Sequence, residues 1–180
     1  MNPKFIEQLR LVPAGNGWLS RDDPGEPGLQ TPRWSINEIE GQILAELVKG
    51  YDVLEIGTGL GISTMFLFST AKILWTFDID PWVQDRVFPL LPKAIFTSKV
   101  FPDVSPGVRK FDAAFIDGFH EYQSVMEDIA KARKVVKDGG LLLFHDVNIL
   151  GVKNAILSSG LGLIEIKTAA GMGMAWNNKE

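Results

Sequence analysis

The chain has no cysteine among its 180 residues, so it contains neither a disulfide framework nor a thiolate metal site. It also lacks an apolar run of the roughly 18 residues that a membrane-spanning helix requires. No long basic run is present and the net charge is −4, so nucleic acid is not an expected partner. The first twelve residues include Glu7 and Arg10 and have no signal-peptide core. We therefore expect a cytoplasmic protein that does not contact membranes.

Proline and glycine are concentrated near the N-terminus and divide the chain into two parts. Residues 13–34 are rich in both and contain Trp18 and Trp34. A loop of this length is usually functional or disordered. We expect residues 1–34 to form an arm that closes over a site as a lid, packs on the sheet edge or contributes to a homodimer. Residues 35–180 are expected to form a single domain.

Strand-like and helix-like segments alternate along this domain. Strands are expected near 52–57, 73–78, 94–97, 112–117 and 140–146, and helices near 60–70, 82–91, 121–137 and 149–159. This alternation predicts an α/β fold with a doubly wound, mainly parallel sheet covered on both faces. Residues 161–176 are expected to add a hairpin, which makes a seven-stranded sheet with an antiparallel last strand.

Local signals predict where two helices begin and end. Ser35-x-x-Glu38 fits a capping box, so a helix is expected to start at Ser35 and to end at Gly50. Gly139-Gly140 is expected to close the helix at 121–137.

The segment VLEIGTGLGIST at residues 53–64 combines a short apolar strand with Gly57, Gly59 and Gly61. Glycine permits positive φ and lets a ligand approach the main chain, and the next helix begins with N–H groups that can face that ligand. The following strand ends on Asp78, and an acid about 20 residues after a glycine turn can accept hydrogen bonds from a ribose diol. The pattern predicts a site for a small polar cofactor, and a plain strand–helix turn is the alternative.

Asp80 competes with Asp78 for the ribose because the segment reads FDIDP. Pro81 marks the turn that leaves the strand and starts the next helix, which favours Asp78.

Further acidic and imidazole side chains follow two later strands. Asp117 ends the strand at 112–117, and His145 and Asp146 end the strand at 140–146. The carboxyl ends of neighbouring parallel strands share one edge of a sheet, so we expect these side chains to lie together. Two carboxylates with imidazole or water suit a hard divalent ion such as Mg²⁺. Acids at strand ends also cap helices, and this structural role is the alternative.

The motif Glu55-x-Gly57-x-Gly59-x-Gly61, with the acidic end of the second strand, resembles the class I S-adenosylmethionine-dependent methyltransferases. The resemblance implies a Rossmann-like methyltransferase fold and S-adenosylmethionine as cofactor. It also implies a set of cofactor-binding residues around the turn and the strand ends: Glu55, Gly57, Thr58, Gly59, Gly61, Ser63, Asp78, Ile79 and Asp117.

The motifs D-G-x-H-x-Y at 117–122 and H-D at 145–146 resemble the metal-dependent O-methyltransferase branch, both catechol-type enzymes and those that methylate sugars or natural products. The resemblance implies methyl transfer to a hydroxyl of a small molecule or sugar, with Asp117 and Asp146 as metal ligands. His145 stands where other members carry an acid, so it is the third candidate ligand. Catechol-type enzymes have Asn directly after the second acid, whereas this chain has Val147 there and Asn148 one residue later.

His120 lies three residues after Asp117, where catechol-type enzymes hold a lysine general base. A neutral imidazole with a pKa near 6.5 can accept a proton from a hydroxyl near pH 7. The resemblance therefore implies catalytic roles for His120 and Asp117. A structural role for His120 at the start of a helix is the alternative.

Three other functions remain open on this sequence. They are metal-independent methyl transfer to nitrogen or oxygen, aminopropyl transfer on the same fold, and a non-catalytic domain that binds a cofactor or partner.

The chain departs from the family that it resembles at one further position. The resemblance implies an acid after the third strand that contacts adenine, but Ser98 and Lys99 follow the strand at 94–97.

Overall fold

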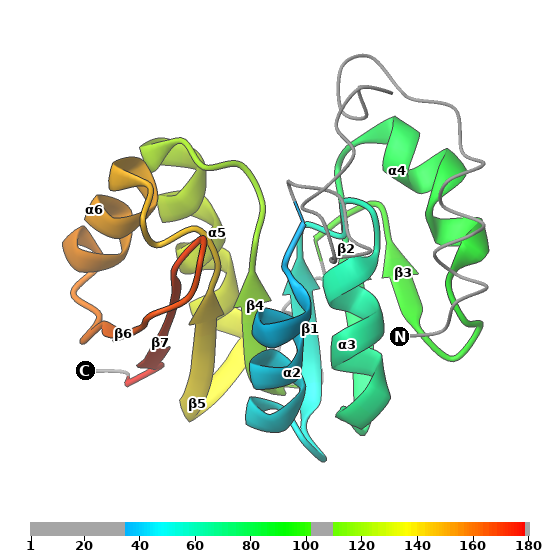
Figure 1. The fold of residues 1–180 in the computed structure, drawn as a ribbon, viewed down its shortest axis with the longest axis horizontal. Coiled ribbons are helices and arrows are strands. Elements are labelled where there is room, and N and C mark those ends of the chain that lie inside the picture. Colours follow the sequence, from blue (N-terminus) through cyan, green and yellow to red (C-terminus); the bar gives the residue numbers. More distant parts are fainter. Residues whose placement is uncertain (1–34, 102–109, 179–180) are drawn as a thin grey trace.

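The computed structural model describes residues 35–101 and 110–178, and a seven-stranded sheet forms their centre (Figure 1). The strand order is β3-β2-β1-β4-β5-β7-β6. The first five strands pair in parallel, and β7 runs antiparallel to both of its neighbours. This confirms the predicted sheet and its antiparallel last strand. The strands are β1 (Asp52–Ile56), β2 (Ile73–Phe77), β3 (Phe96–Ser98), β4 (Phe111–Ile116), β5 (Val136–Phe144), β6 (Ile164–Ile166) and β7 (Met172–Trp176).

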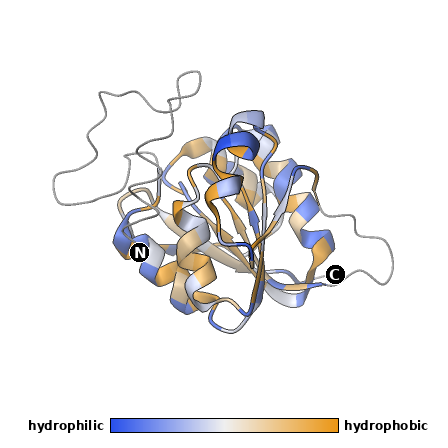
Figure 2. Ribbon diagram, turned by 90° about the vertical axis from the view of Figure 1, so that its right-hand side faces the viewer, coloured by the Kyte–Doolittle hydropathy of each residue, from blue (hydrophilic) through white to orange (hydrophobic). Residues whose placement is uncertain are grey.

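Helices cover both faces of the sheet. One buried cluster joins α5 and α6 to the sheet through residues such as Leu54 and Phe144. A second cluster joins α2 and α3 to the opposite face through residues such as Val53 and Phe115. Successive strand residues thus point to opposite helical layers, and hydrophobic residues run through the central strands (Figure 2). The helices are α2 (Glu38–Leu47), α3 (Ile62–Thr70), α4 (Pro81–Arg86), α5 (Tyr122–Val135) and α6 (Leu150–Ser158), with a short 3₁₀ turn, η1 (Phe88–Leu90).

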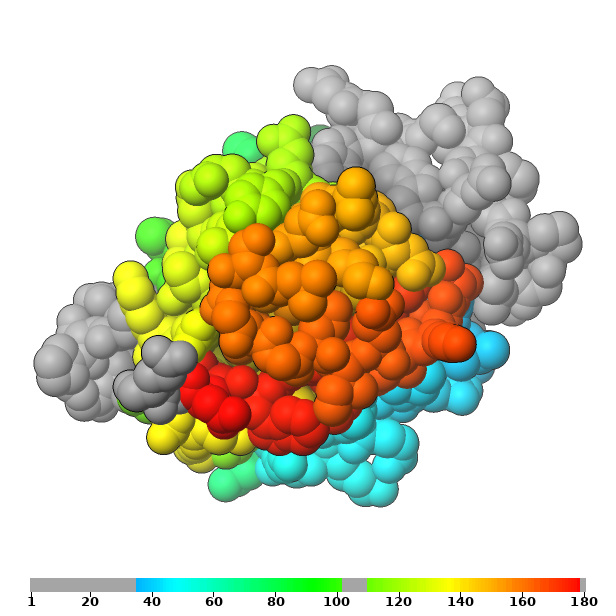
Figure 3. Space-filling model, turned by 90° about the vertical axis from the view of Figure 1, so that its left-hand side faces the viewer, coloured from blue at the N-terminus to red at the C-terminus, as the bar shows by residue number. Residues whose placement is uncertain are grey.

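The C-terminal part of the chain forms one side of the molecule. Figure 3 shows α6 in the middle of this side and the end of the chain that includes β7 at its lower margin. Within 35–101 and 110–178, no helix has both the length and the apolar character needed to cross a membrane. The predictions for the arm at residues 1–34, including the roles of Trp18 and Trp34, lie outside the described residues.

The helix predicted at 82–91 and the predicted start of α2 both differ from the structure. The helix expected at 82–91 is interrupted because Pro89 has no N–H and its ring clashes with the preceding helical turn. As a result α4 ends at Arg86 and the 3₁₀ turn follows. The capping box involves Asn37 and Glu40, whose side chains each accept the other's N–H at 3.0 Å, so α2 begins at Glu38 and Ser35 is not its cap.

The fifth strand begins earlier than its sequence predicts. The helix before it ends at Val135, and β5 starts at Val136. Gly139, with φ 70°, lies inside β5, and the pairing register between β4 and β5 shifts along this stretch. Gly139-Gly140 therefore belongs to an irregular strand and does not close the helix, because a residue with positive φ can sit in a bulge.

A buried carboxyl group connects β1, β2 and α3 on the face covered by α2 and α3. Glu55 is completely buried and accepts hydrogen bonds from Ser63, Thr64 and Thr76 at 2.5–2.6 Å. Burial dominates over these hydrogen bonds and raises the pKa of Glu55 from 4.5 to about 7. The group fixes the start of α3 relative to the strand that precedes the glycine turn.

The raised pKa of Glu55 predicts a specific pH dependence of stability. The folded chain binds this proton more tightly than the unfolded chain, so the contribution is present at low pH and is lost as the pH rises from 4.5 to 7. Relative to Glu55→Gln, the wild type should lose up to about 3 kcal/mol of unfolding free energy across this range. Urea unfolding of both proteins at several pH values measures it, and parallel pH curves would contradict the assignment.

Candidate functional site

The register of the parallel strands brings four candidate residues to one edge of the sheet. Ile56 pairs with Phe77 on one side and with Ile116 on the other, and Ile116 pairs with Phe144. The residues that follow these four positions are therefore adjacent: Gly57, Asp78, Asp117 and His145. The predicted meeting of strand ends is confirmed by this register.

Only glycine fits at the first position of the turn. A Cβ on Gly57 would lie 2.1 Å from the carbonyl oxygen of Asp117, and the residue has φ 91°. Any other residue would push β1 and β4 apart at their carboxyl ends and would adopt a strained backbone. The first glycine thus allows the turn and the loop after β4 to approach each other closely.

Asp78 faces the glycine turn, as predicted. Its carboxylate accepts the N–H of Gly59 at 3.0 Å and the N–H of Asp80 at 2.9 Å. Burial outweighs these hydrogen bonds and raises the pKa of Asp78. Asp80 instead accepts the N–H of Trp82 at 2.8 Å and caps α4. Both residues line the cavity beside the turn, and the choice of Asp78 as the ribose ligand stays a prediction.

A cavity lies beside the turn, between the ends of the strands and helices α4 and α5. The predicted cofactor residues Gly57, Asp78, Ile79 and Asp117 line it. Glu55, Thr58 and Ser63 are buried. Ser63 donates a hydrogen bond to Glu55, and the hydroxyls of Thr58 and Thr76 lie 2.6 Å apart. Gly61, with φ 76°, is the N-cap residue directly before α3. Their contacts with a cofactor stay predictions.

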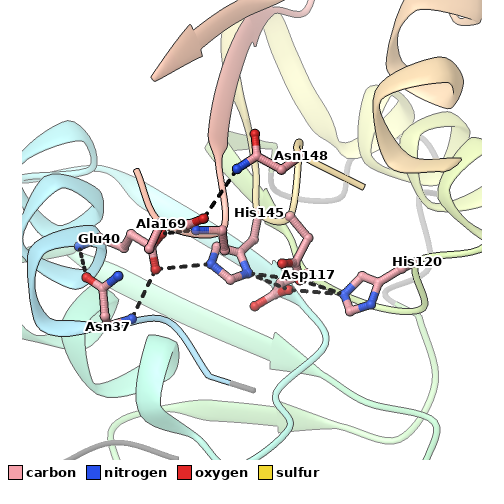
Figure 4. Close-up of polar contacts among 9 residues, drawn as sticks. Asn37, Glu40, Asp117, His120, His145, Asn148 and Ala169 are labelled. Carbon is pink, nitrogen blue, oxygen red and sulfur yellow. Dashed lines mark hydrogen bonds and ion pairs between the residues drawn. The ribbon is translucent and has the colours of Figure 1, made fainter. Parts of the chain in front are cut away.

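Both histidines of the chain meet the strand-end carboxylates (Figure 4). His120 Nε2 lies 2.9 Å from Asp146 Oδ2 and 3.8 Å from Asp117 Oδ1. Candidate ligand atoms of Asp117, His120 and Asp146 all lie within 4.8 Å of one another. The His120 side chain is 45% exposed, so the cluster is open to an incoming molecule.

His145 is turned toward the interior of the domain. Its Nδ1 lies 3.2 Å from Asp146 Oδ2 and 3.4 Å from Asp117 Oδ1, and its Nε2 lies 3.3 Å from Glu40 Oε2. Both ring nitrogens therefore face carboxylates. Among the described residues, the group that could hold a metal ion consists of Asp117, His120 and Asp146. The sequence analysis favoured His145 in place of His120. The role of His145 as a metal ligand stays a prediction.

The electrostatics of the cluster follow from these contacts. Hydrogen bonds to Asp117 and Asp146 raise the pKa of His120 to about 9. Although burial opposes its charge, His145 has a pKa raised to about 12 by Asp117, Asp146 and Glu40. Burial alone would raise the pKa of Asp117 and of Asp146. The two histidines outweigh this effect and lower the pKa of both carboxyl groups. Without a bound ligand the cluster is a set of paired charges.

The backbone at Asp146 is also unusual. Its φ is 56°, and it is the one residue other than glycine with positive φ among the described residues. Residues other than glycine rarely adopt positive φ, and Asp tolerates it better than most of them. Asn148 points away from the cluster and donates its amide to the carbonyl of Ala169 at 3.3 Å (Figure 4).

Glu40 is the residue of this region that sequence reasoning missed. It is 1% exposed and accepts N–H groups from Asn37 and Ala170 in addition to its contact with His145. Although burial opposes ionisation, these partners lower its pKa to about 2. The capping-box spacing from Asn37 was a usable local signal, but the contact with His145 joins residues 105 positions apart.

A family model described as a methyltransferase domain matches residues 54–147, which is just over half of the chain. The chain therefore belongs to this methyltransferase family. The matched segment runs from β1 to the residue after Asp146 and contains the glycine turn, Asp78 and the Asp117–His120–Asp146 cluster. None of the curated proteins compared with the chain matches it.

Solved structures share the fold at low sequence identity. A Klebsiella pneumoniae protein provisionally named an O-methyltransferase is 20% identical with a TM-score of 0.72, covering 98% of this chain and 89% of that one. TomG, an O-methyltransferase from Streptomyces achromogenes, is 18% identical with a TM-score of 0.68, covering 98% and 96%. An O-methyltransferase from Bacillus cereus is 18% identical with a TM-score of 0.67, covering 81% and 83%. These neighbours confirm the methyltransferase fold.

The buried contact between Glu40 and His145 predicts a large effect on stability. Replacing Glu40 by Gln removes one partner of a buried ion pair, which typically costs about 3–5 kcal/mol. Glu38→Gln is the matched control, since Glu38 is exposed on the same helix and should change unfolding free energy by less than about 0.5 kcal/mol. Urea unfolding measures both, and equal stabilities would show that the pair contributes nothing.

Proposed function

We propose that this chain transfers the methyl group of S-adenosylmethionine to a hydroxyl of a small molecule or sugar. The supporting observation is the shared strand edge, where the glycine turn and Asp78 lie beside the Asp117–His120–Asp146 cluster. TomG was crystallised with S-adenosylmethionine and the Bacillus cereus enzyme with S-adenosylhomocysteine, and both are named O-methyltransferases. The family and the geometry thus support the same donor.

In this proposal the turn at residues 57–61 lies under the donor and Asp78 accepts the ribose hydroxyls. The carboxylate of Asp78 accepts the N–H groups of Gly59 and Asp80, and its two oxygens together have acceptor capacity beyond these bonds for a ribose diol. Asp117 lines the same cavity, so the donor's sulfonium end is expected near the cluster. Placing donor and acceptor in line can supply roughly 7–11 kcal/mol of barrier reduction.

His120 is the proposed general base. Its Nε2 faces Asp146 and Asp117, so the other ring nitrogen, Nδ1, takes the proton of the acceptor hydroxyl. The oxygen lone pair forms a bond to the methyl carbon. The carbon–sulfur bond breaks at the same time, and its electrons stay on sulfur, which leaves S-adenosylhomocysteine. Asp117 and Asp146 hold the imidazole in place and stabilise its charge after proton transfer. The positive sulfonium of the bound donor favours the neutral imidazole that the step requires.

The donor set also fits a divalent cation. Two carboxylates and an imidazole converge within 4.8 Å, and such ligands suit Mg²⁺ or a similar ion. Asp117, Asp146 and His120 would hold the ion, which would lower the pKa of a hydroxyl bound beside it. An imidazole nitrogen that holds an ion cannot accept the proton as well, so the metal-dependent and metal-independent forms assign His120 different roles.

Donor binding tests the first half of the proposal. Asp78→Asn should weaken binding of S-adenosylhomocysteine roughly tenfold or more, because the ribose loses a charged acceptor. Asp80→Asn is the matched control, since an Asn cap preserves α4 and Asp80 is not the proposed ribose ligand. Calorimetric titration measures both, and a larger loss in Asp80→Asn would reverse the assignment.

Turnover tests the second half. With methyl-labelled donor and a panel of phenols, catechols and sugars, Asp146→Asn should bind S-adenosylhomocysteine within about threefold of wild type yet lose methyl transfer. Mass analysis of the spent cofactor separates methyl transfer, which gives S-adenosylhomocysteine, from aminopropyl transfer. Full activity in EDTA would exclude a role for a metal ion, and His120 would then be the group that removes the proton from the acceptor hydroxyl. Wild-type turnover by Asp146→Asn would contradict the proposed cluster.

A further inference from the structure

The cavity beside Asp78 has an end that the proposed reaction does not use. It extends from the glycine turn to α5, where Ser124, Glu127, Asp128 and Lys131 line it. The proposed ribose and methyl sites account for Asp78 and Asp117 only. A role for this α5 end rests on the proposed function, since it concerns the adenine of the same donor.

The other walls of this cavity are apolar and partly aromatic. Phe77, Val83 and Phe119 line it, and the Phe77 ring packs edge-on against Phe101 with centroids 5.6 Å apart. Such walls suit the faces of a flat heterocycle, and a small number of polar groups then fix its orientation at the edge. Adenine has this character, because its faces are apolar and its exocyclic amino group donates hydrogen bonds.

Asp128 is the polar group that reaches farthest toward the strand ends. A Cβ on Gly118 would lie 2.9 Å from Asp128 Oδ2, so the carboxylate occupies the space directly beside the residue after Asp117. A side chain at position 118 would therefore displace this carboxylate from its present position. Asp128 lies on the buried side of α5, three residues after the buried Val125.

The surroundings of Asp128 leave it able to accept another hydrogen bond. Its side chain is 14% exposed, and Lys131 Nζ lies 3.6 Å from Oδ1. The same ammonium also lies 6.0 Å from the centre of the Phe101 ring. Burial outweighs the effect of Lys131 and raises the pKa of Asp128. A donor N–H in the cavity would stabilise the ionised carboxylate, which has two oxygens and acceptor capacity beyond one ammonium.

We propose that Asp128 accepts a hydrogen bond from the exocyclic amino group of the donor's adenine and selects adenosyl donors over other nucleosides. This assigns the recognition to helix α5, whereas Ser98 at the end of β3 and Lys99 directly after it carry no carboxylate. Glu127 lines the same cavity but is exposed and interacts with Gln123 at 3.4 Å on its own helix. Asp128 is thus a specificity-determining residue that acts on the part of the donor remote from the reacting methyl group.

A double-mutant cycle between protein and ligand tests the proposal. The two ligands are S-adenosylhomocysteine and its analogue that carries unsubstituted purine in place of adenine. In the wild type, loss of the amino group should weaken binding roughly ten- to hundredfold. In Asp128→Ala the same change in the ligand should alter affinity by less than about threefold, because the partner is already absent.

Two further variants make the result decisive. Glu127→Ala is the matched control and should discriminate between the ligands as the wild type does. Asp128→Asn keeps a neutral acceptor and should discriminate with a reduced ratio, and it supplies the measurement if Asp128→Ala does not fold. Wild-type discrimination in both Asp128 variants would overturn the inference and leave the proposed function intact. Failure of the wild type to bind either ligand would contradict the proposed function itself.

Discussion

The parallel register of β1, β2, β4 and β5 is the constraint on which the rest of the site depends. Hydrogen-bonded pairing ends at the same level in all four strands, so the next residue of each lies at one edge. The close approach of Gly57 to the carbonyl of Asp117 is possible only because no Cβ intervenes. A side chain at this position would separate the glycine turn from Asp117.

Paired charges hold this edge to the rest of the domain. The imidazole of His145 connects the carboxylates of Asp117 and Asp146 to Glu40, which is buried on α2 and also accepts the N–H of Ala170. Burial of any one of these groups alone would be unfavourable, because an unpaired charge loses its hydration. Together they tie α2 and the loop before β7 to the site. Asp146, the residue with the unusual φ, belongs to the same network.

The order and type of the elements could be predicted from the chain because apolar periodicity and glycine positions are local properties. Boundaries were less predictable where two local rules competed. At residues 82–91 the helical pattern was clear, but Pro89 ended the α-helix early. At Gly139 a glycine that resembled a helix end lies inside β5, because pairing with β4 extends the strand toward Val136. Long-range pairing decided that boundary, and no local signal reports it.

The sequence by itself determined the glycine turn, Asp78 and the strand-end positions of Asp117 and Asp146, since each follows directly from a strand that its own residues specify. Only the tertiary structure decided which imidazole faces outward and which faces Glu40. It also decided that Asp128, on a helix, reaches the end of β4 beside Gly118. The physical reason is distance along the chain: contacts between residues far apart depend on how whole elements pack, and local patterns do not encode that packing.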